Sequence, residues 1–201
     1  MPQLTDAQLA ERLTFIGGSD AAAVCGVNPY TTAFDVFQRY MGVAPPKPAN
    51  DAMRWGTMVE GVIGEFYAER SGRRLLLGTW TYRHPIHTFM GCHPDAFHAD
   101  GSLPTQLDVV EIKHTSRKLK QGMFPYDYVV QLYHNMIVCQ VEQGTLVVAA
   151  GGRPPIWQDF TITREITDWI IAIESKFWQA VQQRKWEVFD AAGTPGISSG
   201  A

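Results

Sequence analysis

A strand-like segment, LDVVEIKHTSRK at residues 107–118, carries an acid and a base close together near the end of an apolar run. Because successive side chains of a strand point to opposite faces, Glu111 and Lys113 lie on the same face. Val110 and Ile112 lie on the other face, where we expect them to pack against the core. Taken alone, Glu-x-Lys is typical of a surface ion pair at the end of a strand, which would contribute little to stability.

Asp95, in the turn-like segment HPDAF, adds a second carboxylate in the spacing Asp-x15-Glu-x-Lys. Carboxylates from adjacent strands of a sheet can converge on one hard divalent cation, which prefers oxygen ligands. Such an ion polarises a phosphoryl oxygen and lowers the pKa of bound water. The ammonium group of Lys113 would then lie close to the same water or to the scissile phosphate. Besides the ion pair, the three residues therefore predict a metal-dependent hydrolytic site.

A third acid, Glu60, lies among glycines on a helix predicted over residues 53–71. Each of Gly56, Gly61 and Gly64 costs the helix interior about 1 kcal/mol relative to alanine, so we expect another backbone or a ligand to come close there. One interpretation is tight packing of the helix on a sheet, with Glu60 at its rim. The other makes Glu60 a further carboxylate of the metal site, directly or through water.

A helix predicted from near Pro125 carries a polar stripe of Gln131, His134 and Asn135. These residues are three and four positions apart, so they share one side of the helix. A polar stripe is typical of a solvated helix face. If the stripe faces an acidic site instead, its amides could orient a catalytic lysine or a water molecule.

The segment IGGSDAAA, residues 16–23, predicts a helix start that could bind an anion. Glycines leading into a helix whose first residues include Ser19 combine backbone N–H groups, the helix dipole and a hydroxyl. An ordinary N-cap is the alternative. Further along the chain, Ser116 and Arg117 follow the acid–base pair, and arginine is well suited to bind phosphate. Lys118 and Lys120 extend a local basic patch.

The elements that must position these residues run from helices to strands and back to helices. Helices are expected at residues 5–13, 19–25, 31–42, 53–71, 124–140 and 163–188, with strands within 74–90, 91–101, 107–113 and 144–150. This order predicts an α/β or α+β fold with a small central sheet. We expect one domain over residues 1–190 and a disordered tail at 191–201.

The composition limits the class of protein. With 45% hydrophobic and 18% charged residues, the chain has an ordinary globular balance. A net charge of -3 gives no overall basic field, although a local basic patch remains compatible with it. The three cysteines form no CxxC pair, which argues against a structural zinc site and a disulfide framework. Without a signal-like or membrane-spanning segment, we expect a cytoplasmic protein with no membrane partner.

Five stretches, in this order, resemble the YqaJ-type viral recombinase nucleases, which are relatives of the lambda phage exonuclease within the PD-(D/E)XK nuclease superfamily. They are IGGSDAAAVCGVNPYTTAFDVFQRYMG, WGTMVEGVIGEFYAERSG, HPDAF, VVEIKHTSR and FPYDYVVQLYHNMIV. Each motif is short and unspecific, but the ordered set is more specific. The resemblance implies a restriction-endonuclease-like core, with a small central mixed β-sheet flanked by helices.

The resemblance also implies roles for individual residues. Asp95 and Glu111 would bind catalytic Mg²⁺, for which Mn²⁺ could substitute, and the Ile112 carbonyl would be a further ligand. Lys113 would position or activate the attacking water. The supporting acid and glutamine of the family match Glu60, which is also a metal-ligand candidate, and Gln131. The residues expected to contact the 5′-phosphate of a DNA end are Ser19, Ser116 and Arg117.

The function implied is a Mg²⁺-dependent DNA exonuclease of phage-type recombination in a bacterial or phage-infected cell. It would degrade one strand of linear duplex DNA from 5′ to 3′ and expose a 3′ single strand. Its partners would be double-stranded DNA ends, a single-strand annealing protein and further copies of itself in a ring such as a trimer. An endonuclease of the same superfamily and a non-cleaving DNA-end binding or assembly protein are the alternatives.

Overall fold

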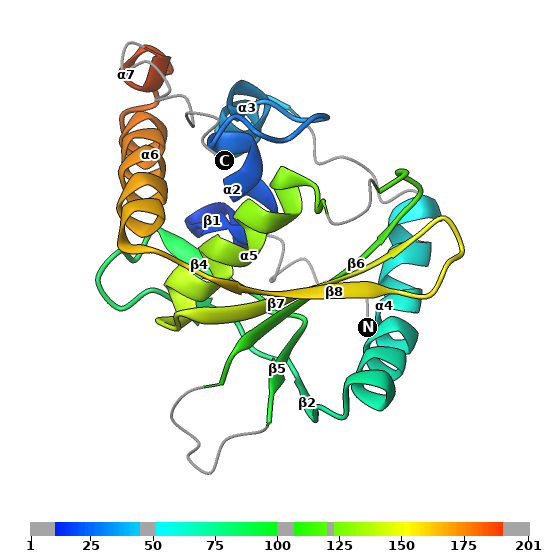
Figure 1. Cartoon of the computed structure of the whole chain (residues 1–201). Helices are drawn as coiled ribbons and strands as arrows, with labels where there is room; N and C mark the ends of the chain where they lie inside the picture. Colours follow the sequence, from blue (N-terminus) through cyan, green and yellow to red (C-terminus); the bar gives the residue numbers. More distant parts are fainter. Residues whose placement is uncertain (1–10, 45–50, 100–106, 120–122, 191–201) are drawn as a thin grey trace.

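Two mixed sheets organise the residues described by the computed structural model, which are 11–44, 51–99, 107–119 and 123–190 (Figure 1). The larger sheet has the order β2-β5-β6-β7-β8, with strands Leu75–Leu77, Ala96–His98, Val109–Thr115, Gln143–Ala150 and Ile156–Thr161. The smaller sheet has the order β1-β4-β3, with strands Ile16–Gly17, Met90–Cys92 and Tyr82–Arg83. In the described sheets, β6 pairs with β7 and β1 with β4 in parallel, and the other pairs are antiparallel.

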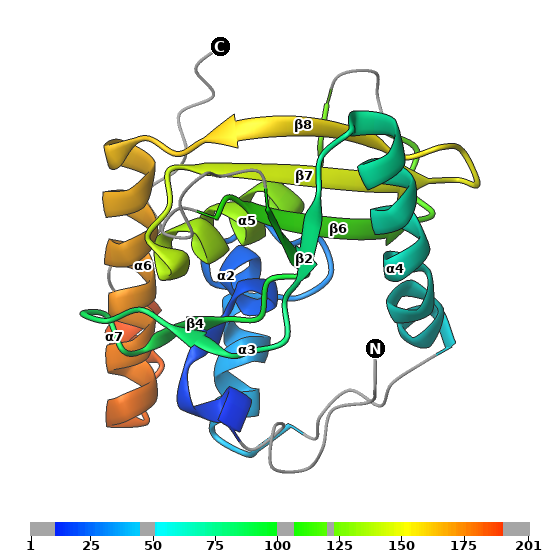
Figure 2. The ribbon, with the colours of Figure 1, turned by 90° about the horizontal axis from the view of Figure 1, so that it is seen from below.

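Helices flank the sheets, as the sequence predicts. They are η1 (Arg12–Thr14, a 3-10 turn), α2 (Gly18–Val24), α3 (Ala33–Tyr40), α4 (Asp51–Ser71), α5 (Tyr126–Cys139), α6 (Arg164–Gln183) and α7 (Glu187–Asp190). Helices α4 and α6 lie at opposite ends of the molecule, with α5 and the central strands between them (Figures 1 and 2). In the described part of the chain, no helix is both long and apolar enough to cross a membrane.

Strand β6 is covered on both faces, and this explains its apolar run. On one face, Val110 and Ile112 pack in a buried cluster with Ile63 and Tyr67 of α4. On the other face, Val109 belongs to a cluster built with side chains of α5. A strand buried on both sides reads as a nearly continuous hydrophobic segment. The Glu111 side chain of this strand is therefore buried inside the molecule.

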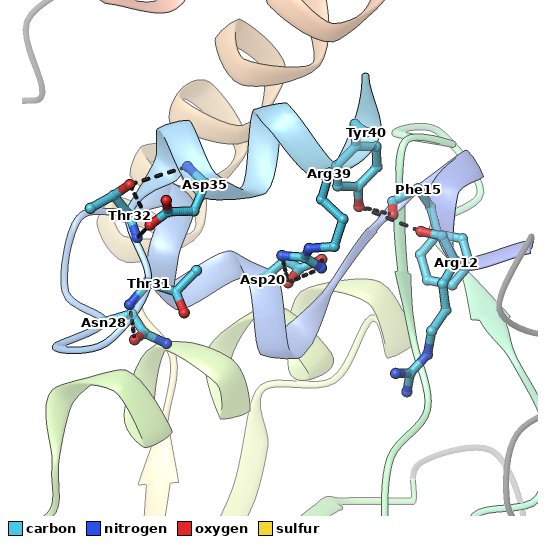
Figure 3. A network of polar contacts seen from close by, with 9 residues as sticks. All are labelled: Arg12, Phe15, Asp20, Asn28, Thr31, Thr32, Asp35, Arg39 and Tyr40. Carbon is cyan, nitrogen blue, oxygen red and sulfur yellow. Dashed lines mark hydrogen bonds and ion pairs between the residues drawn. The ribbon is translucent and has the colours of Figure 1, made fainter. Parts of the chain in front are cut away.

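The start of α2 is held by polar contacts with neighbouring segments (Figure 3). Asp20 forms a double hydrogen-bonded ion pair with Arg39 of α3, with N–O distances of 3.0 and 3.1 Å. The Tyr40 hydroxyl donates to the Phe15 carbonyl. Helix α3 itself begins with a capping box between Thr32 and Asp35. These contacts hold α2 and the segment before it against α3.

Local signals predict most of the described helices correctly. The capped helix over 31–42 corresponds to α3, the glycine-containing helix to α4, and the helix starting near Pro125 to α5, for which Pro125 is the N-cap. The predicted closing helix over 163–188 is wrong in one respect. Arg184 adopts a left-handed conformation with φ 55°, which ends α6 and separates it from α7.

Strand β8 is absent from the sequence-based expectations. It is the edge strand of the larger sheet, and its Ile156, Trp157 and Asp159 side chains are exposed. Because neither face of β8 is buried, its sequence IWQDFT lacks the alternation of apolar and polar residues that marks a half-buried strand. The predicted tail at 191–201, Lys120 and most of the predicted first helix at 5–13 lie outside the described residues.

Candidate active site

The predicted acid–base cluster forms where β5 and β6 lie side by side. Asp95 immediately precedes β5, and its Oδ2 accepts a hydrogen bond from the Ile112 backbone N–H at 2.8 Å. On β6, the Lys113 Nζ lies 2.5 Å from Glu111 Oε1. The Glu111 side chain is only 1% exposed, whereas that of Lys113 is 20% exposed. The pair is therefore not the surface ion pair that the motif alone would favour.

Helix α5 contributes two amides that hold the Glu111 carboxylate. The Gln131 Nε2 donates to Glu111 Oε1 at 2.5 Å, and the Asn135 Nδ2 donates to Oε2 at 2.8 Å. The two amides are four residues apart, so one side of α5 delivers both. Together with Lys113, three donors fill three of the roughly four lone-pair positions of the carboxylate. One oxygen position remains for a further ligand.

In the polar stripe on α5, His134 and Asn135 are buried and Gln131 is half-buried, so the interpretation of the stripe as a solvated face is wrong. His134 is fully buried, and it contacts Glu174 Oε1 through Nδ1 at 2.8 Å and the Gly91 carbonyl through Nε2 at 3.0 Å. Asn135 is 1% exposed. Asn135 lies on this stripe, but of its two amides only Gln131 is predicted individually as a site residue. Its i+4 spacing from Gln131 is the signal that could have linked it to the same carboxylate.

Glu60 of α4 belongs to the same electrostatic environment. Burial, together with the nearby Asp95 carboxylate, raises the pKa of Glu60, and the Lys113 ammonium partly opposes this rise. The glycines around Glu60 differ in their surroundings, so they do not all support the same one of the two interpretations, helix–sheet packing or a nearby ligand. A Cβ on Gly64 would lie 3.1 Å from Ile112 Cδ1, so this glycine serves helix–sheet packing. A Cβ on Gly56 or Gly61 would meet no described atom within 4 Å.

The cluster holds more negative than positive charge in a poorly solvated place. Burial and the neighbouring Asp95 raise the pKa of Glu111 to about 7, although Lys113 opposes the shift. Burial also raises the pKa of Asp95. Burial alone would lower the pKa of Lys113, but the Glu111 and Asp95 carboxylates outweigh it and raise this pKa. Three acids thus share one lysine, which is the electrostatic condition under which a bound cation is favourable.

The donor set fits a hard divalent cation rather than a thiophilic metal, because its acids offer only carboxylate oxygens. In the described ranges, no group of three or more His, Cys, Asp or Glu side chains is arranged to hold a metal ion. A cation here would therefore use the Asp95 and Glu111 carboxylates and take its other ligands from backbone, water or substrate. Mg²⁺ commonly binds in this way, with one or two carboxylates, several waters and substrate phosphates.

Arg117 makes contacts that its sequence context does not predict. Its Nη1 and Nη2 each donate to an Asp127 carboxylate oxygen at 2.8 Å, and its Nε donates to the Tyr30 hydroxyl at 3.2 Å. The guanidinium group also lies over the rings of Tyr30 and Tyr128. The hydrogen bonds with Asp127 raise the pKa of Arg117. Its polar edge is thus occupied by a carboxylate, and the neighbouring Ser116 is exposed.

Ser19 is the second residue of α2 and is exposed. It is not the N-cap, because Gly17 holds that position without a side-chain hydrogen bond. The preceding residue, Gly18, packs against α5, and a Cβ on Gly18 would lie 2.3 Å from Asn135 Oδ1. The start of α2 therefore touches a residue that binds Glu111, which links the predicted anion-binding segment to the carboxylate cluster.

Comparison with known proteins gives one family and several structural relatives. A family model described as the YqaJ-like viral recombinase domain matches residues 9–142. The uncharacterized protein YqaJ of Bacillus subtilis (strain 168) is 27% identical over 180 residues, in a match that covers 86% of this chain and 55% of that protein. The chain thus spans about half the length of this curated relative.

Solved structures with a similar fold include two exonucleases. The alkaline exonuclease LHK-Exo from Laribacter hongkongensis has a TM-score of 0.72 and 19% identity, with 90% of this chain and 94% of that chain covered. A phage-related exonuclease from Haemophilus somnus 129PT has a TM-score of 0.62 and 11% identity, with 85% and 96% covered. At these identities the likeness shows a shared fold. It confirms the predicted class, a small mixed sheet flanked by helices.

Proposed function

The chain belongs to the family of YqaJ-like viral recombinase domains, and on this basis we propose that it is a metal-dependent deoxyribonuclease, namely an exonuclease acting on duplex DNA ends. The observation that carries the proposal is the buried cluster of Asp95, Glu111 and Lys113, with two amides of α5 holding Glu111. Relatives of the same fold are named exonucleases, and LHK-Exo is also known in complex with dAMP, a deoxynucleotide.

The proposed cofactor is Mg²⁺, with Mn²⁺ as a possible substitute. Asp95 and Glu111 would hold the ion through carboxylate oxygens, the Ile112 carbonyl would be a further ligand, and Glu60 would support the site. A bound ion of this kind polarises a phosphoryl oxygen and lowers the pKa of bound water. The surplus of carboxylates over ammonium groups supports this assignment, because a divalent cation would neutralise it.

Lys113 and Gln131 would organise the reacting groups. The Lys113 ammonium lies beside Glu111, so it can donate hydrogen bonds to the attacking water or to a nonbridging phosphate oxygen. Its 20% exposed side chain leaves it accessible to a substrate. Gln131 keeps the Glu111 carboxylate in one orientation through its Nε2 donor. These side chains belong to a strand and a helix of the core, which favours a site that is formed before substrate binds.

For the DNA end, we assign Ser19, Ser116 and Arg117 as candidate contacts of the 5′-phosphate. Ser19 and Ser116 are exposed hydroxyls. Arg117 would have to exchange its hydrogen bonds with Asp127 for hydrogen bonds with phosphate, and both groups can accept two parallel hydrogen bonds from the guanidinium. The assignment therefore includes a local rearrangement at the start of α5.

The wider role that we propose is phage-type recombination in the cytoplasm of a bacterial or phage-infected cell. The enzyme would remove one strand from 5′ to 3′ and leave a 3′ single strand for an annealing protein. A homo-oligomeric ring, for example a trimer, would reconcile a subunit of net charge -3 with DNA binding if basic residues line its centre. The family name supports a role in recombination.

The decisive experiment compares end-labelled linear duplex DNA, carrying a 5′-phosphate, with closed circular DNA. With Mg²⁺ and the purified protein, the linear duplex should lose 5′ nucleotides progressively, and the circle should stay intact because an exonuclease needs an end. Chelation of the metal should stop the reaction. Cleavage of the circle would identify an endonuclease instead, and binding of DNA ends without turnover in Mg²⁺ or Mn²⁺ would identify a non-cleaving binding protein.

A further inference from the structure

Asn135 occupies a position between the Glu111 carboxylate and the first residue of α2. Its Nδ2 donates to Glu111 Oε2 at 2.8 Å, and it is 1% exposed. Its Oδ1 is buried and has no hydrogen-bond partner among the described residues. The orientation of the amide follows from chemistry, because only its NH₂ end can donate to a carboxylate. The Oδ1 atom must therefore point away from Glu111.

The Oδ1 atom points at Gly18. A Cβ on Gly18 would lie 2.3 Å from Asn135 Oδ1, a distance that no real side chain tolerates. The φ of Gly18 is not positive, so space rather than backbone conformation requires glycine at this position. The adjacent Gly17 differs, since a Cβ there would make only an ordinary contact with the Phe15 ring at 3.8 Å.

Neither element can move away easily. Helix α2 is tied to α3 through the Asp20–Arg39 ion pair. Helix α5 is tied to β4 and α6 through His134, which contacts the Gly91 carbonyl and Glu174. A change of volume at Gly18 should therefore displace the Asn135 side chain rather than a whole helix, and that side chain holds Glu111.

We propose that Gly18 and Asn135 act together as a spacer that sets the Glu111 carboxylate, which makes Asn135 a positioning residue for the reaction. The main chain of α2 supports the Asn135 amide from one side, and the amide supports the carboxylate on the other. The inference rests on the proposed nuclease function for its catalytic meaning. The close approach of Gly18 to Asn135 does not depend on the proposed function.

A double-mutant cycle tests the spacer in the full chain. The variants are Gly18→Ala, Asn135→Ala and the double variant, and Gly17→Ala adds a methyl group one residue away as the matched control. Three quantities are measured for each protein: the cleavage rate of end-labelled duplex as a function of Mg²⁺ concentration, the affinity for Mn²⁺ by calorimetry, and the urea unfolding curve.

Asn135→Ala should lower the cleavage rate or the metal affinity by about 10–100-fold, as is usual when a group that orients a metal ligand is lost. Gly18→Ala should act in the same direction. In the double variant, the Oδ1 atom is gone and the new methyl group keeps its contact with Gln131 Cγ at 3.3 Å, so Gly18→Ala should cost much less in the Asn135→Ala background than it does alone. Gly17→Ala should keep the Mn²⁺ affinity of the original chain, and its unfolding curve should show only the cost of alanine at the N-cap of α2.

The spacer is overturned if the effects of Gly18→Ala and Asn135→Ala multiply, or if Gly18→Ala behaves like the original chain. A purely structural role is shown if both variants shift the unfolding curve but leave the Mg²⁺ dependence and the rate per folded molecule unchanged. If the original chain binds Mn²⁺ but cleaves no DNA, the proposed function fails while the Mn²⁺ affinities still decide the spacer. A chain that neither binds Mn²⁺ nor cleaves DNA overturns both.

Discussion

Two buried carboxylates contact neighbouring residues of helix α5 and differ in almost every other respect. Glu111 of β6 accepts from Asn135, and Glu174 of α6 contacts His134. Glu174 and His134 are both 0% exposed, so their pair is sealed inside the protein. Glu111 is equally buried, but the Lys113 beside it reaches solvent with 20% of its side chain exposed. We call His134 and Glu174 the closed centre. We call Asp95, Glu111, Lys113 and Glu60 the open centre, because Lys113 reaches the solvent from which a substrate would bind.

The two centres also differ in charge. His134 and Glu174 form a pair whose charges can cancel, and the second nitrogen of His134 is satisfied by a backbone carbonyl. The Glu111 centre has three acids and one lysine, and the pKa of each acid is raised by burial. A hydrogen-bonded pair whose opposite charges cancel is more compatible with a stable buried core than an excess of charges of one sign. Glu174 thus has the surroundings of a structural residue, whereas Glu111 has those expected of the proposed reaction centre.

The largest expected effect is the loss of activity in Glu111→Gln. Removal of one preorganised electrostatic group from a reaction centre costs about 10²–10³-fold in rate, and we expect at least this loss in cleavage of end-labelled duplex. The free energy of unfolding should not fall, because the substitution removes one of three mutually repelling acids. Cleavage assays and urea unfolding on the same preparation check both points. Full activity of Glu111→Gln or of Lys113→Ala would break the site assignment.

Arg117 and Asp127 form a third ion pair, which resembles the closed centre in its hydrogen bonds and lies beside the proposed DNA-end site. If Arg117 binds the 5′-phosphate, Arg117→Ala should reduce the preference for 5′-phosphorylated over 5′-hydroxyl ends by about 10–100-fold, as for the loss of a charged hydrogen bond of about 1.5–3 kcal/mol. The ratio of the two cleavage rates is the measurement.

Asp127→Asn is the companion variant, since it releases Arg117 from its carboxylate partner without removing the guanidinium. The preference for 5′-phosphorylated ends should persist or increase in this variant. If both substitutions change only the unfolding curve and leave the ratio of rates unaltered, Arg117 belongs with the closed, structural centre and the phosphate assignment is wrong.

Glu174→Ala should destabilise the fold with little effect on the chemistry. The variant leaves the Nδ1 of buried His134 without its partner, which costs about 1–3 kcal/mol of the free energy of unfolding. Glu174→Gln is the control. Nε2 of His134 must carry a proton to donate to the Gly91 carbonyl, so in neutral His134 the Nδ1 can accept from the glutamine amide. We therefore expect Glu174→Gln to retain most of the stability.

The same pair predicts a pH dependence of stability. Burial alone would lower the pKa of His134, but the Glu174 carboxylate and the Gly91 carbonyl outweigh burial and raise it above its ordinary value of 6.5. The stability contributed by the charged pair is therefore fully present below pH 6.5 and is lost as the pH rises through the folded-state pKa. Urea unfolding across this range should show the loss, and Glu174→Gln should flatten it. An identical slope in both proteins would contradict the assignment.

Local patterns in the sequence predict much of the open centre and little of the closed one. Alternation places Glu111 and Lys113 on one face of β6, and helix periodicity places Gln131 on α5. The bond from the Ile112 N–H to Asp95 and the pairing of Arg117 with Asp127 join segments that no local period relates. Contacts of this kind depend on how strands and helices stack, and that order is absent from any short window of sequence.

The misassigned parts have the same cause. His134 reads as part of a polar, solvated stripe, because the sequence does not show that Glu174, forty residues later, covers it. The sequence predicts Gly18 as part of an anion-binding helix start and does not show that Gly18 also leaves room for Asn135. Strand β8 has no buried face to mark it. In each case the missing information is the identity of the neighbour across the core.

The smallest expected effect concerns the open side of α4 next to Glu60. A Cβ on Gly61 would meet no described atom within 4 Å, so Gly61→Ala should raise the free energy of unfolding by about 0.5–1 kcal/mol. If this space admits the DNA backbone, the same methyl group should raise the KM for duplex DNA several-fold. Gly64→Ala is the contrast, since its Cβ would press on Ile112 Cδ1 at 3.1 Å. An unchanged KM in Gly61→Ala would mean that the open centre ends at Glu60, and that the substrate approaches from the side of Lys113 alone.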